Sequence, residues 1–98
     1  MKLALTPLAR SDIDEIWRYV FTGSGSEEIA TRLVDKLRQT ILRLRRNPRM
    51  GRSRSDDLGG ELRSLPREGY VIFYRIDKDV LRVIRVLHGS RDARKLLM

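Results

Sequence analysis

The spacing of apolar residues predicts an α-helix near the start of the chain. Lys2–Leu5 is a short apolar run long enough for an edge or central strand, and Thr6-Pro7 follows it as a typical helix start. Gly23-Ser24-Gly25 then interrupts the helical pattern. The apolar stripe of this helix consists of Ile13, Ile16, Trp17, Val20 and Phe21.

A second helix is predicted directly after this break. Ser24 and Glu27 have the spacing of a capping box, and Ser26 is the competing N-cap. Asn47-Pro48 ends the helix, because the residue before a proline is pushed out of the helical region. The two helices are therefore expected to form an antiparallel helical hairpin. The apolar stripe of the second helix consists of Ile29, Ala30, Leu33, Val34, Leu37, Ile41 and Leu44.

From residue 70 onward the composition changes to that of strands. Tyr70–Ile76 and Val80–His88 are rich in aromatic and β-branched residues, and Asp77-Lys78-Asp79 is predicted to join them in a β-hairpin. Pairing Ile76 with Val80 across a three-residue loop gives two largely apolar faces, so the helices are expected to cover one and a partner the other. The first face holds Tyr70, Ile72, Tyr74, Ile84, Val86 and His88, and the second holds Val71, Phe73, Arg75, Leu81, Val83, Arg85 and Leu87.

The remaining segments complete a small α+β fold. Glu61–Pro66 is a plausible strand, and Arg67-Glu68-Gly69 would turn it into the hairpin. Residues 48–60 form a loop rich in Gly, Ser and charge, and residues 91–98 form either a short helix or a loose end. The predicted order is β-α-α-β-β-β, with the helical hairpin on one face of a small, mostly antiparallel sheet, in a single domain over residues 1–98.

The positive charge of the chain is concentrated in one segment. There are 21 Lys and Arg residues against 13 Asp and Glu, and residues 36–55 hold eight basic groups and no acidic one. Such a block suggests an acidic partner, either nucleic acid or an acidic protein segment, and the alternative is a solvated helix end and loop. The predicted basic patch comprises Arg43, Arg45, Arg46, Arg49, Arg52 and Arg54.

The rare residue types exclude several classes of chemistry. The absence of cysteine excludes a disulfide framework, a thiol nucleophile and a thiolate metal site. With a single His, no zinc site is expected, and no cofactor is predicted. No signal peptide or membrane span is visible, so we expect a cytoplasmic protein without membrane contact.

Five motifs in a fixed order resemble the ParE/RelE superfamily of toxins from bacterial type II toxin–antitoxin modules. They are LTPLARSDIDEIWRYV at 5–20, NPRMGR at 47–52, LRSLP at 62–66, YVIFYR at 70–75 and IRVLHGSRD at 84–92. The arrangement looks most like the ParE branch. The resemblance implies a growth-arresting, plasmid-stabilising toxin that is neutralised by a ParD-like antitoxin with an acidic C-terminal segment. DNA would then be contacted only indirectly, through the antitoxin.

The resemblance also leaves the target open between two branches. ParE-like toxins are associated with inhibition of DNA gyrase by contact, whereas RelE-like toxins cleave mRNA on the ribosome. Cleavage would need an acid or base and cations on the developing phosphorane charge, and the candidates are His88, Arg75, Arg85 and Arg63. The lysine cluster of the RelE-type site is missing, which favours the gyrase inhibitor and predicts no catalytic residues. A scaffold that binds an antitoxin without being toxic is the third possibility.

Contacts to the antitoxin are expected on the uncovered sheet face and on the first helix. Aromatic side chains and arginines commonly anchor such interfaces. The predicted antitoxin-binding residues are Trp17, Arg63, Tyr70, Phe73, Tyr74, Arg75 and Arg85.

Overall fold

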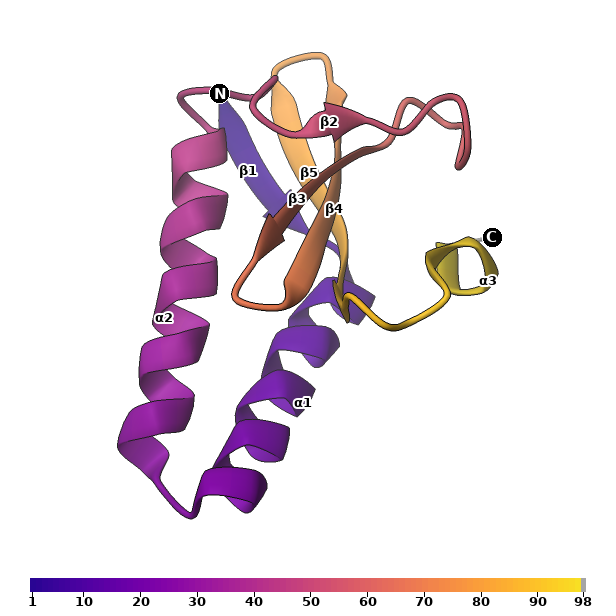
Figure 1. Cartoon of the computed structure of the whole chain (residues 1–98). Coiled ribbons are helices and arrows are strands. Elements are labelled where there is room, and N and C mark those ends of the chain that lie inside the picture. Colours follow the sequence, from indigo (N-terminus) through magenta and orange to yellow (C-terminus); the bar gives the residue numbers. More distant parts are fainter. Residues whose placement is uncertain (98) are drawn as a thin grey trace.

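The computed structural model describes residues 1–97 and confirms the α+β class (Figure 1). Its order contains the predicted β-α-α-β-β-β pattern, with one additional two-residue strand and a short terminal helix. The elements are β1 (Lys2–Leu5), α1 (Pro7–Ser24), α2 (Glu27–Leu44), β2 (Arg52–Ser53), β3 (Arg63–Arg67), β4 (Tyr70–Asp77), β5 (Val80–His88) and α3 (Ala93–Leu97).

The strands form one five-stranded sheet in the order β1-β5-β4-β3-β2. Within residues 1–97 only the β1–β5 pair is parallel, and the chain between these two strands contains the helical hairpin α1–α2. Figure 1 shows α1 and α2 side by side against the sheet, with α3 on the other side. Among residues 1–97, no helix is both long and apolar enough to cross a membrane.

The start of α1 is tied to the sheet by its own capping residue. The Thr6 hydroxyl accepts a hydrogen bond from the Ala9 amide at 3.0 Å, as expected of an N-cap. The same hydroxyl donates to the carbonyl of Ile84 on β5 at 2.7 Å. One side chain therefore both starts the helix and sets where it meets the sheet.

The structure decides between the two predicted caps of α2. Ser26 is the N-cap and accepts from the Ile29 amide at 3.2 Å, whereas the Ser24 hydroxyl donates to the Val20 carbonyl at the end of α1. Ile29 was expected in the apolar stripe of this helix, but it is exposed. The buried stripe begins at Ala30, because the first turn of α2 extends beyond the sheet (Figure 1).

The predicted three-residue hairpin loop is wrong. Asp77 pairs with Val80, so the connection is the two residues Lys78 and Asp79, with Lys78 at φ +59°. A bulge follows: Phe73 pairs with Arg85 and Tyr74 with Val83, which leaves Ile84 as the extra residue.

These two register changes alter which side chains face the helices. The two-residue loop pairs Ile76 with Leu81 and Tyr74 with Val83, so Leu81 and Val83 lie on the same face as Tyr74 instead of the opposite one. The bulge then shifts the pairing once more and keeps Val86 on this face, opposite Ile72. Leu81 and Val83 are fully buried in the main core. That core comprises Ala9, Ile13, Ile16, Val34, Leu37, Ile41, Leu44, Tyr70, Ile72, Tyr74, Leu81, Val83 and Val86.

The strand predicted at Glu61–Pro66 is observed two residues later, as β3. Glu61 has φ +56°, a left-handed conformation that does not continue a strand. At the other end Arg67 pairs with Tyr70, and Glu68 and Gly69 form a two-residue turn with φ values of +54° and +82°. Positive φ at both central residues matches the twist of paired strands, which explains a tighter turn than the one predicted.

Candidate functional site

The second sheet face, expected to be open for a partner, is largely covered by the chain itself. We call this surface, on the side of the sheet away from α1 and α2, the far face. Phe73 and Leu87 lie on it, and each is only 3% exposed. Leu58 from the 54–60 loop and Ala93 from α3 line a hollow of about 360 Å³ together with them. The expectation of an uncovered apolar face is therefore wrong.

Arg54 fastens the loop over the far face. Its guanidinium carbon lies 5.9 Å from the centre of the Phe73 ring, and its Nη1 donates to the Ser64 hydroxyl at 3.1 Å. Its Nε donates to the Asp57 carboxylate at 3.0 Å, and these hydrogen bonds raise the pKa of Arg54 and lower the pKa of Asp57. The Asp57 carbonyl in turn accepts from Arg94 of α3 at 3.3 Å.

The predicted basic patch is consequently smaller than its sequence suggests. Arg54 is occupied by Asp57 and lies against Phe73, so it is not available as a free cation. Arg45 donates from Nε to the Met1 carbonyl at 3.1 Å but keeps an exposed side chain. The exposed members are Arg43, Arg45, Arg46, Arg49 and Arg52.

Two of the predicted antitoxin contacts, Tyr74 and Arg63, hold the 48–51 loop against the sheet. The fully buried Tyr74 hydroxyl accepts from the Gly51 amide at 2.8 Å and donates to the Pro48 carbonyl at 2.7 Å. Burial raises the pKa of Tyr74. Arg63 donates from Nη1 to the Gly51 carbonyl at 2.8 Å. Both side chains are committed to internal contacts.

Arg85 is committed to Asp12 of α1. Arg85 Nε and Nη2 donate to the two Asp12 carboxylate oxygens at 2.7 and 2.8 Å, and the Val86 amide donates to the same group at 2.9 Å. The hydrogen bonds to Asp12 raise the pKa of Arg85. Bidentate pairing of this kind fixes the guanidinium, so Arg85 presents little free charge to a ligand.

His88 lies at the exposed end of β5. Its ring packs edge-to-face on Tyr70 with the ring centres 5.4 Å apart, and burial raises the pKa of Tyr70. Its Nδ1 accepts from the Ser90 amide at 3.1 Å and lies 2.7 Å from the Ser90 hydroxyl. These contacts hold Nδ1 as an acceptor, which places the proton of the neutral ring on Nε2.

The four residues considered for RNA cleavage do not converge on one point. Arg75 is paired with Arg82, six residues before His88 on β5, which separates the two rows by about 20 Å. Arg63 is directed to the 48–51 loop, and Arg85 to Asp12. In residues 1–97 there is also no cluster of three His, Cys, Asp or Glu side chains that could hold a metal ion.

Trp17 is half-buried and packs against the main core. Its Nε1 donates to the Thr31 hydroxyl of α2 at 3.1 Å, and its ring stacks on that of Phe21 with the centres 5.2 Å apart. Tyr19 on the same helix is exposed. Trp17 therefore joins the two helices and keeps part of its surface accessible.

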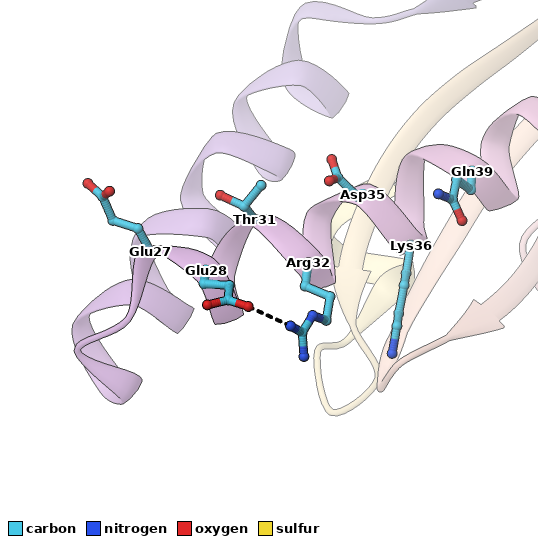
Figure 2. Close-up of a pocket in the computed structure, with 7 residues that line it drawn as sticks. All are labelled: Glu27, Glu28, Thr31, Arg32, Asp35, Lys36 and Gln39. Atoms are coloured by element: carbon cyan, nitrogen blue, oxygen red, sulfur yellow. Dashed lines mark hydrogen bonds and ion pairs between the residues drawn. The ribbon is translucent and has the colours of Figure 1, made fainter.

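The outer face of α2 carries charged side chains that do not form a site. Figure 2 shows them along one side of the helix, with Glu28 and Arg32 joined in an ion pair of 2.7 Å. Lys36 further along contacts Glu68 at 3.0 Å, and this hydrogen bond lowers the pKa of Glu68. Because the charges alternate in sign and point into solvent, we interpret this face as a solvated helix surface.

Two features of the structure have no counterpart in the patterns of the sequence. The first is the pair of Asp12 and Arg85, since Asp12 is not among the candidate residues and no local pattern links it to Arg85. The second feature is an apolar groove between β1 and the two helices, lined by Leu3, Leu5 and Leu42. Leu3 and Leu5 belong to the apolar run at the start of the chain and line the groove because β1 is an edge strand, whereas Leu42 lies outside the predicted apolar stripe of α2.

Comparison with known proteins agrees with the fold. Residues 3–93 match the family model described as the ParE toxin of the type II toxin–antitoxin system parDE. Toxin ParE1 of Caulobacter vibrioides is 34% identical over 90 residues, covering 92% of this chain and 91% of that protein. Toxin ParE3 of the same organism is 30% identical over 81 residues, covering 83% and 79%.

A solved structure described as a chromosomal ParDE toxin–antitoxin system from P. aeruginosa shares the fold. Its TM-score is 0.78 at 22% identity, covering 90% of this chain and 95% of that one. The sequence matches span nearly all of the elements described above, including both long helices and the hairpin β4–β5. The chain therefore belongs to the ParE family of toxins of type II toxin–antitoxin systems.

Proposed function

We propose that this protein arrests bacterial growth by inhibiting DNA gyrase through protein contact, and that an antitoxin produced with it neutralises it. The observation that carries the proposal is the ParE toxin match over residues 3–93. The related proteins in C. vibrioides are named toxins. In this proposal the protein works in the cytoplasm, as one domain, and contacts DNA only through its antitoxin.

The geometry supports a toxin that acts by contact and not by catalysis. Cleavage of RNA needs a proton donor or acceptor and cations gathered around one phosphate. Here the Arg85 guanidinium is neutralised by Asp12, and Arg75 lies about 20 Å along the sheet from His88. No group of side chains among those considered is arranged for in-line attack, so we infer a non-enzymatic toxin.

Charge supports an acidic antitoxin as the binding partner. The chain carries a net charge of +8, and five arginines of the basic patch are exposed. Disordered acidic segments that fold on binding are well suited to such a surface. Of the predicted antitoxin contacts, Trp17 and Arg75 keep accessible surface, whereas Tyr74 is fully buried and could not be reached without rearrangement of the 48–51 loop.

The decisive experiment is induced expression of the protein alone in a bacterium, with chromosomal breaks and transcript integrity followed together. We expect growth arrest, broken DNA and intact transcripts, and restored growth when the antitoxin encoded beside the toxin gene is expressed. The purified protein should also inhibit supercoiling by gyrase. His88→Ala serves as the matched variant, because His88 is exposed and its loss should leave the fold intact.

Two other outcomes would contradict the proposal. Cleaved transcripts with intact DNA, abolished by His88→Ala, would identify a ribosome-dependent endoribonuclease. Normal growth with a stable antitoxin complex would identify a scaffold that has lost its toxicity. Because both measurements come from the same culture, a single induction separates the three possibilities.

A further inference from the structure

A hollow lies where α1 passes the first residues of β4 and the last residues of β5. It has a volume of about 510 Å³ and shares no lining residue with the groove beside β1. Ile16 and Val86 in its lining are buried and give it a rigid apolar base, whereas Glu15 and Tyr19 are exposed. The hollow is therefore preformed and open to a partner.

The hydroxyl of Tyr70 has no partner in this hollow. Tyr70 lines it and is only 8% exposed. None of the side-chain hydrogen bonds of residues 1–97 involves this hydroxyl, and its oxygen is not sealed in the core, because the one sealed polar atom without a partner there is Nε of Arg75. A buried tyrosine usually finds a hydrogen-bond partner for its hydroxyl, so a ligand in the hollow would supply the missing one.

A second tyrosine lies close to the first. Burial raises the pKa of Tyr70, and the nearby phenol of Tyr19 adds to this rise. Tyr19 lines the same hollow and is 75% exposed. The two phenols give the hollow aromatic surface and two hydroxyl oxygens that can accept hydrogen bonds.

Glu15 adds an unpaired negative charge. The chain carries a net charge of +8, yet Asp12 and Glu15 both line this hollow. Asp12 is neutralised by Arg85, whereas within residues 1–97 no ion pair includes Glu15. Arg91 lines the hollow as well, but it does not reach Glu15 within ion-pair distance. The free groups of the hollow are therefore hydrogen-bond acceptors and one carboxylate.

We propose that this hollow receives an arginine side chain of the target protein. A guanidinium is planar and positively charged, stacks on aromatic rings and carries only hydrogen-bond donors. It can lie against the Tyr19 ring while its N–H groups donate to Glu15 and to the Tyr70 hydroxyl. This inference rests on the proposed function and names part of the surface through which the toxin contacts gyrase. Tyr70, predicted from the sequence as an antitoxin contact, then faces the target.

Other occupants of the hollow fit less well. A phosphate or carboxylate would be repelled by Glu15. An apolar side chain would cover Glu15 and the Tyr70 hydroxyl without giving either a partner, which is costly for buried polar groups. A lysine ammonium is compact and strongly hydrated, so it matches the charge but not the flat aromatic surface. Arginine is the side chain that uses ring, hydroxyl and carboxylate together.

Two substitutions test the hollow through the protein concentration that half-inhibits supercoiling by gyrase. Tyr19→Ala removes an aromatic wall, and Glu15→Gln removes the charge but keeps the shape of the side chain. Each should raise this concentration about tenfold or more, because buried arginine anchors carry much of the binding energy of an interface. Both side chains are exposed, so both variants are expected to fold.

Glu27→Gln is the matched control for the loss of charge. Glu27 is an exposed carboxylate at the start of α2 and does not line the hollow. Its substitution should leave the half-inhibiting concentration unchanged. All three variants should bind the antitoxin encoded beside the gene as tightly as the wild type, which would show that their fold is intact.

A titration with a small probe tests the ligand without gyrase. The cationic probe N-acetyl-arginine amide is added at about 150 mM salt, which screens its repulsion by the net charge of +8. We expect the ring signals of Tyr19 and Tyr70 in NMR spectra to shift at millimolar probe. N-acetyl-citrulline amide has nearly the same shape without the charge, and it should bind at least about tenfold more weakly.

The outcomes separate this inference from the function on which it rests. Gyrase inhibition that is equally strong in the wild type, Tyr19→Ala and Glu15→Gln overturns the site and leaves the proposed function standing. Equal weakening by Glu15→Gln and Glu27→Gln also overturns it, since the effect would then come from net charge alone. If the wild type does not inhibit gyrase, the proposed function fails, and the titration decides on the hollow.

The titration has its own contrary results. Equal binding of the two probes, or no binding of either, overturns the arginine site whatever the target is. Self-association that is lost in Glu15→Gln would assign the arginine to a second copy of this chain and overturn the target as its source. Stronger binding of the arginine probe, together with weaker gyrase inhibition by both site variants, is the result that we expect.

Discussion

The Asp12 carboxylate on α1 binds Arg85 on β5 through both of its oxygens, across 73 positions of the chain. The side chains are only 8% and 14% exposed, so this pair is shielded from solvent and salt. It lies beyond the end of β1, where α1 packs directly on β5. The contact therefore holds α1 on β5 beyond Val83, where the pairing of β5 with β1 has ended.

Asp12→Ala should be strongly destabilising. Removal of the carboxylate leaves the Arg85 guanidinium and the Val86 amide without their partner in a buried place. We expect the free energy of unfolding to fall by about 3 kcal/mol. Urea denaturation of the single variants and of the Asp12→Ala/Arg85→Ala double variant measures the coupling between the two groups.

The exposed pair on α2 provides the control for this prediction. Glu28 and Arg32 are also 2.7 Å apart but point into solvent. Glu28→Ala should cost less than about 0.5 kcal/mol, since exposed ion pairs one helical turn apart contribute little. Equal costs for Asp12→Ala and Glu28→Ala would show that burial of the Asp12–Arg85 pair has no energetic importance.

Gly51→Ala should destabilise the contact between the 48–51 loop and the sheet. A Cβ at Gly51 would lie 2.5 Å from the Tyr74 hydroxyl oxygen and 2.7 Å from its Cε1 atom. Tyr74 is fully buried and cannot move aside, so either the loop or the ring must shift. We expect a loss of about 1–3 kcal/mol in the free energy of unfolding, measured by urea denaturation.

Gly23→Ala should raise stability instead of lowering it, and this variant serves as the comparison for Gly51→Ala. Gly23 is in the last turn of α1, and a Cβ there would meet nothing within 4 Å. Alanine restricts the unfolded chain and favours the helix, so stability should rise by about 0.5–1 kcal/mol. If both alanine variants shift stability in the same direction, steric contact with Tyr74 is not the cause of the effect at Gly51.

The helices, the N-cap of the first helix and the order of the elements along the chain could be predicted because local chemistry specifies them. Thr6-Pro7 marks the helix start by itself, and Gly25 ends α1 in a left-handed conformation at φ 70°. The hairpin register could not be predicted, because it depends on the bulge at Phe73/Tyr74. The bulge keeps Val86 on the same buried face as Leu81 and Val83, and no local pattern in the strands shows this requirement.

The candidate site was harder to predict than the fold, for a related reason. Arg85, Arg63 and Tyr74 have the composition of a binding surface, but each is taken up by a residue far away in the chain. The groove beside β1 has the opposite origin. Leu3 and Leu5 have the composition of core residues, but the edge position of β1 leaves them accessible. The charge pattern was a better guide to the surface, because most of the arginines in the basic patch are exposed.

Arg54→Ala should release the loop that covers the far face. The variant loses the hydrogen bonds to Asp57 and Ser64 and the contact with the Phe73 ring. We expect the amides of residues 54–60 to exchange more rapidly, by about tenfold, while the core amides of β4 change little. Arg52→Ala, from an exposed neighbour in the same segment, should leave the exchange unchanged.

Acid should release the same loop in the wild-type protein. The pKa of Asp57 is lowered by its hydrogen bonds to Arg54, so the folded state favours the ionised carboxylate. The contact is complete above the ordinary aspartate pKa of 3.8, and it is lost as the pH falls through the lower value of the folded state. Exchange of the loop amides that stays equally slow below this range would show that Asp57 does not hold the loop.

Tyr74→Phe should lower stability at neutral pH and reduce its loss in alkali. Without the hydroxyl, the Gly51 amide and the Pro48 carbonyl lose their partner, at a cost of about 1–2 kcal/mol. In the wild-type protein burial raises the pKa of Tyr74 above 10.0, so its stabilisation is complete below that pH and is lost as the pH rises through the folded-state pKa. Urea denaturation from about pH 8 to 11 should show a shallower decline for the variant. Tyr19→Phe, which removes an exposed hydroxyl, should follow the wild type, and a decline as steep in Tyr74→Phe as in the wild type would assign the alkaline loss to other groups.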